Sequence, residues 1–128
     1  MKKNELTDLF NDHPVLSALT EKIKSASETR LGAEGLYGSS KAVAIARVFR
    51  ETPFTQLVVV AEKEDAAYLY NDLVSLSGDD SVFFFPSTYK RSVLYEQTEP
   101  ANIVLRTEVF NFLSSAARKG IIVTYPES

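Results

Sequence analysis

The chain has 128 residues, 45% of them hydrophobic, and this size and composition fit one compact domain. Its formal net charge is −3, so it lacks the overall basic charge that attracts nucleic acid. It has no cysteine and a single histidine, which excludes disulfides, thiolate metal sites and multi-histidine metal sites. No apolar run approaches the length of a membrane span, and no apolar stretch follows the basic first residues as in a signal peptide. These features predict a soluble cytoplasmic domain with no membrane partner.

The first thirty residues predict an N-terminal helical segment, which we separate from an α/β domain over residues 31–128. Pro14 suits the first position of a helix, because its missing N–H would be unpaired there in any case. Leu19 and Ile23 follow at helical spacing, with charged residues between them.

Apolar strands and amphipathic helices then alternate along the chain. The expected strands are Thr29–Leu36, Gln56–Ala61, Ser81–Phe85 and Ile121–Thr124, and the expected helices are Ser40–Glu51, Lys63–Leu76 and Ala101–Arg118. This alternation is typical of βαβ crossovers in a parallel sheet with helices on both faces. The sequence ends directly after an expected strand, so we expect a piece of a longer, three-layer α/β protein.

The burial of these elements is also predicted by their pattern. The run Gln56–Ala61 is apolar without alternation, which indicates an interior strand buried on both faces. Leu57–Ala61, Val82–Phe85 and Ile121–Thr124 are therefore all expected as interior strands. In the last helix, we expect Leu113 to face inward together with its apolar neighbours one turn away.

The stretch Gly35–Lys41 occupies the place of a phosphate loop, between an expected strand and an apolar helix. A working phosphate loop has the pattern G-x-x-x-x-G-K-[ST]. Gly35 and Lys41 match it, but Ser40 replaces the second glycine and Ala42 replaces the hydroxyl residue that holds Mg²⁺. We therefore predict no catalytic or metal site here, and at most weak anion binding by Gly35, Gly38, Ser39, Ser40 and Lys41.

A second candidate site is a basic and aromatic stretch after the third expected strand. Tyr89, Lys90, Arg91 and Tyr95 could stack on bases and neutralise phosphates. Nearby glutamates cancel the local charge, so we favour a solvated loop over a contact with nucleic acid or another partner.

Three stretches resemble a known family. The residues Gly35–Phe49 resemble the phosphate loop and helix of excinuclease B, Phe85–Tyr89 with Arg106–Leu113 are similar to the segment after its third strand, and Ile122–Ser128 are similar to its next strand and loop. Excinuclease B keeps an intact phosphate loop and a long hairpin, which this chain lacks. The combination resembles the N-terminal region of the bacterial transcription-repair coupling factor, whose module is a degenerate copy.

The resemblance implies a RecA-like domain that acts as a non-catalytic structural module. Proteins of that family displace RNA polymerase stalled at DNA lesions and recruit excinuclease A, using ATP and Mg²⁺ in motor domains elsewhere in the chain. The partners implied are the other domains of the same protein and, through them, RNA polymerase, excinuclease A and DNA. This module itself would need no cofactor. The alternative is a nucleotide- or phosphate-binding domain of an ATP-dependent helicase or excinuclease B-like protein.

Overall fold

The computed structural model describes residues 14–25, 32, 38–87, 100–115 and 118–126. Its elements, in chain order, are α2 (Pro14–Ser25), α3 (Ser40–Glu51), β1 (Gln56–Val59), α4 (Lys63–Ser77), β2 (Val82–Phe85), α5 (Pro100–Ser114) and β3 (Ile121–Thr124). The helices expected from the sequence at these places are confirmed. The expected strand Thr29–Leu36 lies outside the described residues except for Gly32, which is exposed and in no strand.

The three described strands form one parallel sheet in the order β1-β3-β2. Ile121 of β3 is in register with Gln56 of β1 on one side and with Val82 of β2 on the other. The central strand is therefore the last one in the sequence. The expected α/β architecture with a parallel sheet is confirmed for this part of the chain.

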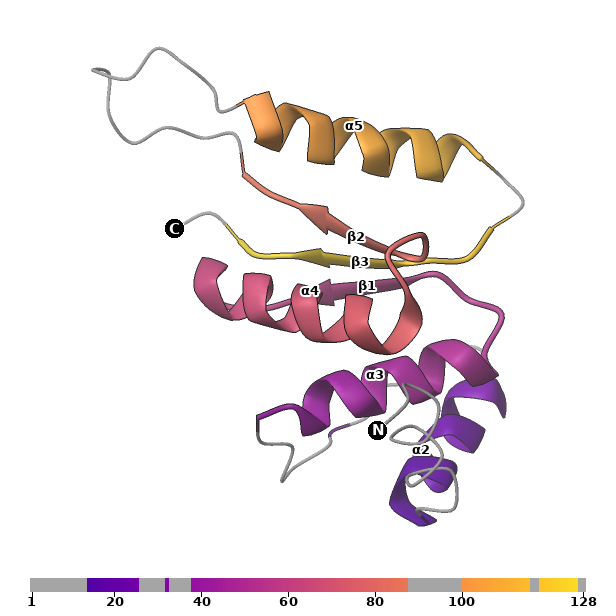
Figure 1. The fold of residues 1–128 in the computed structure, drawn as a ribbon. Coiled ribbons are helices and arrows are strands. Elements are labelled where there is room, and N and C mark those ends of the chain that lie inside the picture. Colours follow the sequence, from indigo (N-terminus) through magenta and orange to yellow (C-terminus); the bar gives the residue numbers. More distant parts are fainter. Residues whose placement is uncertain (1–13, 26–31, 33–37, 88–99, 116–117, 127–128) are drawn as a thin grey trace.

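Helices cover both faces of the sheet (Figure 1). On one face, α3 and α4 pack on the strands through a core that includes Phe49, Leu73 and Val123. On the other face, α5 places Val109 and Phe112 over Ile122. The helix α2 lies against α3, on the side away from the sheet.

Two expectations about burial are wrong. Of the three strands expected in the interior, β3 alone is interior in the described sheet, because β1 and β2 (Val82–Phe85) are its two edge strands. On β1, Leu57 and Val59 are 66% and 60% exposed. Leu57 lies in register with Ile122, which α5 covers, but α5 packs over β2 and β3 and leaves β1 uncovered. On α5 itself, Leu113 is 59% exposed because the helix meets the sheet along the line of Val109 and Phe112.

Local chemistry explains where the helices end. Thr52 leaves the helical region ahead of Pro53, and Lys119 donates hydrogen bonds to the carbonyl oxygens of Phe49 and Thr52 at the end of α3. The last helix, α5, ends at Ser114, four positions before the expected Arg118. Gly120, directly before β3, lies so close to α5 that a Cβ there would be 2.7 Å from the Phe112 ring.

Candidate functional site

The described part of the phosphate-loop-like segment lies at the start of α3. Gly38 has φ +56°, a left-handed conformation that favours glycine, and it is exposed together with Ser39. Ser39 occupies the N-cap position with helical dihedrals, and its side chain makes no capping hydrogen bond. Gly35 lies outside the described residues. The segment therefore leads into α3 without a capping hydrogen bond from the Ser39 side chain.

Ala42 shows why this segment differs from a phosphate loop. Its position corresponds to the hydroxyl residue that holds Mg²⁺ in working loops, and here its methyl group is 0% exposed within the core cluster on α3 and α4. The preceding residue, Lys41, is exposed. Position 41 therefore faces solvent, whereas position 42, which would hold the metal in a working loop, is packed in the core.

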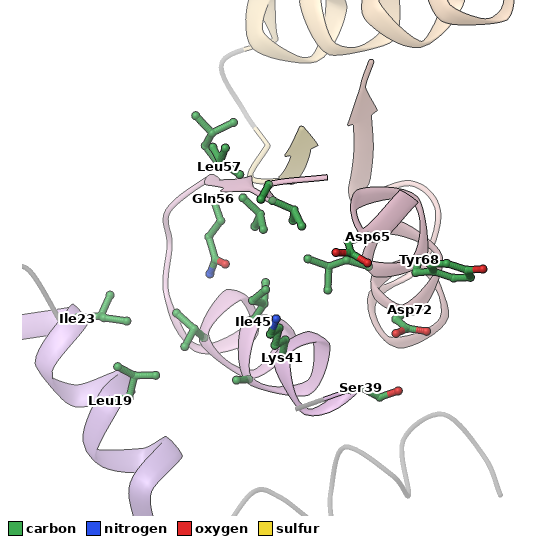
Figure 2. Close-up of a pocket in the computed structure, with 18 of the residues that line it drawn as sticks. Leu19, Ile23, Ser39, Lys41, Ile45, Gln56, Leu57, Asp65, Tyr68 and Asp72 are labelled. Atoms are coloured by element: carbon green, nitrogen blue, oxygen red, sulfur yellow. The ribbon is translucent and has the colours of Figure 1, made fainter. Parts of the chain in front are cut away.

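Lys41 borders a cavity of about 1100 Å³ that we name the edge groove. The groove lies beside the edge of β1 that β3 does not occupy, between that strand and the helices α2, α3 and α4 (Figure 2). Its walls are largely apolar and include Leu19, Ile23, Ala44, Ile45, Val48 and Leu69.

The polar groups of the edge groove carry mixed charge. Lys41 comes from α3, and Asp65 and Asp72 come from α4 on the facing wall (Figure 2). One ammonium against two carboxylates gives this end of the groove a net negative charge, which disfavours a phosphate. Among the described residues, no group of three or more histidine, aspartate or glutamate side chains is placed to hold a metal ion.

A second polar cluster joins the carboxyl ends of β2 and β3. Tyr125 accepts a hydrogen bond through its hydroxyl oxygen from the Ser87 amide at 3.0 Å, and Thr124 donates to the Phe85 carbonyl at 2.8 Å. From α5, Arg106 donates to the Pro86 carbonyl at 3.0 Å and lies 4.1 Å from the centre of the Phe85 ring. The cluster fixes the chain at the point where it leaves β2.

Sequence reasoning missed this second cluster. Its acceptors are mostly backbone carbonyls, which carry no sequence signal, and Arg106 reaches them from a distant helix. The candidate nucleic-acid residues Tyr89, Lys90, Arg91 and Tyr95 follow directly in the chain and lie outside the described residues. Their predicted role as a solvated loop stays a prediction.

Comparison with protein-family models, with curated proteins and with solved structures finds no match to this chain. Within the ranges that the structure describes, no helix is both long and apolar enough to cross a membrane.

Proposed function

We propose that this chain is a non-catalytic structural module of the kind found in the N-terminal region of bacterial transcription-repair coupling factors. In this proposal it has a RecA-like fold and works in the cytoplasm. It holds neighbouring domains of a larger protein in place, and that protein displaces stalled RNA polymerase and recruits the nucleotide-excision-repair machinery. The module itself performs no chemistry.

The observation that carries the proposal is the burial of Ala42. A phosphate loop that binds Mg²⁺ and nucleotide needs a hydroxyl at this position facing the phosphates. Here the position belongs to the hydrophobic core, and Lys41 beside it faces two carboxylates across the edge groove. An apolar side chain at the metal position favours a domain retained for packing over one retained for nucleotide chemistry.

The test is transcription-coupled repair measured with the full-length parent protein. We expect Lys41→Ala to leave ATPase activity, polymerase displacement and repair within about twofold of wild type, since exposed side chains outside a site contribute little. Val123→Ala, which opens a cavity in the central strand, should reduce repair while the distant motor still hydrolyses ATP. Loss of repair in a folded Lys41→Ala protein would refute the proposal that the module is only structural.

A second candidate function is weak binding of a nucleotide or another anion at the start of α3. It is favoured by the exposure of Gly38, Ser39 and Lys41 beside an open groove. Thermal unfolding with millimolar ATP and Mg²⁺ separates the two candidates, because a ligand of the folded state raises the melting temperature. A rise that disappears in Lys41→Ala would favour binding, whereas the scaffold predicts none.

A further inference from the structure

The outer side of α5 is apolar, although none of the described elements covers it. The helix packs on the sheet through Val109 and Phe112, and Figure 1 shows no other described element over its opposite side. Four large apolar side chains of α5 are exposed by half or more of their surface: Ile103, Val104, Phe110 and Leu113. A surface helix normally carries charged residues on the side away from its sheet, and a helix that is apolar all round is normally buried. The outer side of α5 therefore has the composition of a packed surface.

Four residues form one line along this outer side, which we name the α5 seam: Ile103, Thr107, Phe110 and Ser114. Their spacing of four, three and four positions places them on a single face of the helix. The same spacing occurs along the seam of paired helices. None of the four is charged, and the neighbouring Arg106 is turned to the Pro86 carbonyl on the sheet side.

The two hydroxyl residues of the seam turn their polar atoms back onto α5. Thr107 donates a hydrogen bond to the Ile103 carbonyl at 2.8 Å, and Ser114 donates to the Phe110 carbonyl at 2.9 Å. The hydroxyl hydrogens are thus satisfied within the helix, which lowers the cost of burying both side chains. The seam therefore alternates between large and small side chains that can be packed against a second surface.

This alternation has the symmetry of a two-fold interface. The four positions are arranged symmetrically about a point midway between residues 108 and 109. In two antiparallel copies of α5 related by a two-fold axis at that point, Ile103 of each copy lies opposite Ser114 of the other. Phe110 likewise lies opposite Thr107, so that every large side chain meets a small one, as a self-complementary interface requires. A parallel pair would instead place Phe110 against Phe110.

We propose that α5 is a dimerisation surface, which pairs in antiparallel orientation with α5 of a second copy of this chain. Half exposure leaves about 100 Å² on each of the four large apolar side chains. With the smaller residues of both copies included, the pair would bury about 1,200 Å², at the lower end of specific interfaces and suited to a reversible dimer. The uncharged seam lets two copies meet although each has a net charge of −3. The inference goes beyond the proposed function, because it names a contact between two copies of the chain.

Analytical ultracentrifugation of the 128-residue chain tests the dimer. Over protein concentrations from about 1 to about 500 μM, we expect a monomer–dimer equilibrium with a Kd of about 1–100 μM. Phe110→Lys should stay monomeric over this range, because dimerisation would bury an unpaired charge. The matched control is Tyr68→Lys, which introduces the same charge at an exposed aromatic residue of α4 and should dimerise as the wild type does. A monomeric wild type, a dimeric Phe110→Lys or a monomeric control would each overturn the proposal.

Exchanging two residues of the seam tests whether large side chains meet small ones. Thr107→Phe alone sets phenylalanine against phenylalanine, and Phe110→Thr alone leaves a gap, so each should weaken the dimer at least about tenfold. The double variant restores one large and one small residue at each pairing and should recover the wild-type Kd within about threefold. Thermal unfolding checks that the variants fold, since Phe110 also contacts Phe85 of β2. A double variant weaker than both single variants would refute the two-fold pairing.

Disulfide formation tests the orientation, because the chain has no native cysteine. In a mixture of Ile103→Cys chains and Ser114→Cys chains, we expect the two to form a disulfide with each other. Ser114→Cys chains alone should form little, because in the antiparallel pair the two cysteines lie about 16 Å apart along the helix axis, beyond the reach of a disulfide. If Ser114→Cys chains joined to each other faster than to Ile103→Cys chains, the antiparallel pairing would be wrong.

Discussion

Ala42 packs without exposed surface between α3 and its neighbours, so position 42 has no room for a larger polar side chain. A loop repaired by sequence alone, with Ser40→Gly and Ala42→Thr, would satisfy the phosphate-loop pattern. It would also place two additional heavy atoms, one of them a hydroxyl, in a packed core. The core around Ala42 therefore disfavours the hydroxyl residue that the phosphate-loop pattern requires at this position.

We expect Ala42→Thr to destabilise the fold by about 1–3 kcal/mol, the usual cost of overpacking a core. Ser40→Gly alone should cost less than this, because it adds no volume. Urea unfolding of the two single variants and the double variant measures the change in the free energy of unfolding that each substitution causes. A double variant as stable as the wild type, and further stabilised by ATP with Mg²⁺, would show that the position adapts to a nucleotide.

Val59 and Val123 form a matched pair of valines in parallel strands, one 60% exposed at the sheet edge and one 0% exposed at its centre. Val123→Ala should cost about 1–3 kcal/mol, from lost burial and the cavity left behind. Val59→Ala in the isolated chain should change stability by less than about 0.5 kcal/mol, as exposed positions do. If the two substitutions lowered the free energy of unfolding equally, the Val59 side chain would have to be covered by another part of the chain.

Among the elements, α4 meets β2 at Tyr70, whose ring lies 5.5 Å from that of Phe84. Burial raises the pKa of the Tyr70 hydroxyl above its usual 10.0, and the carboxylates of Glu108 and Asp79 raise it further. A raised pKa in the folded state means that folding favours the neutral phenol. The stabilisation is fully present below pH 10 and is lost as the pH rises through the folded-state pKa.

The expected outcome is a free energy of unfolding that falls more steeply above pH 10 in the wild type than in Tyr70→Phe. Urea unfolding at about pH 8 and about pH 11, with the difference between the two proteins taken at each pH, isolates this residue from the other titrating groups. If the difference is the same at both pH values, Tyr70 has no raised pKa. Phenylalanine keeps the ring contact with Phe84, so packing changes little.

The sequence predicted where the helices and strands lie better than which of their side chains are buried. Proline and glycine near the ends placed α2, α3 and α4 correctly, because these residues act through local backbone geometry. The exposure of Leu57 and Leu113 was not predictable, since an apolar pattern shows what a residue can bury but not whether another element arrives to cover it.

For the candidate site, the sequence predicted only which phosphate-loop residues are missing. The replacements at positions 40 and 42 are visible in the sequence and indicate a loop without metal chemistry. The edge groove and its facing carboxylates, Asp65 and Asp72, depend on how α4 packs beside α3, a long-range contact with no local signal. The same holds for the bonds that Arg106 makes to the end of β2.

In the molecule as a whole, packing decreases from the central strand outward. Ile121–Val123 of β3 are buried and have hydrogen-bonded neighbours on both sides. By contrast, α2 packs mainly on α3, and its buried residues include Leu16 and Thr20. The nearly buried Arg47 of α3 joins the two helices, because its guanidinium donates to the Ser17 hydroxyl at 3.1 Å.

Local opening should therefore begin at α2. We expect hydrogen exchange, followed by mass spectrometry, to be fastest in residues 14–25 and slowest in β3, whose amides open only with global unfolding. Ser17→Ala removes the hydroxyl that accepts from Arg47, so it should speed exchange in α2 while leaving β3 unchanged. Ser115→Ala, at an exposed position after α5, serves as the control and should alter neither region. If α2 exchanged as slowly as β3 and Ser17→Ala slowed or sped both equally, the helix would belong to the same cooperative unit as the sheet.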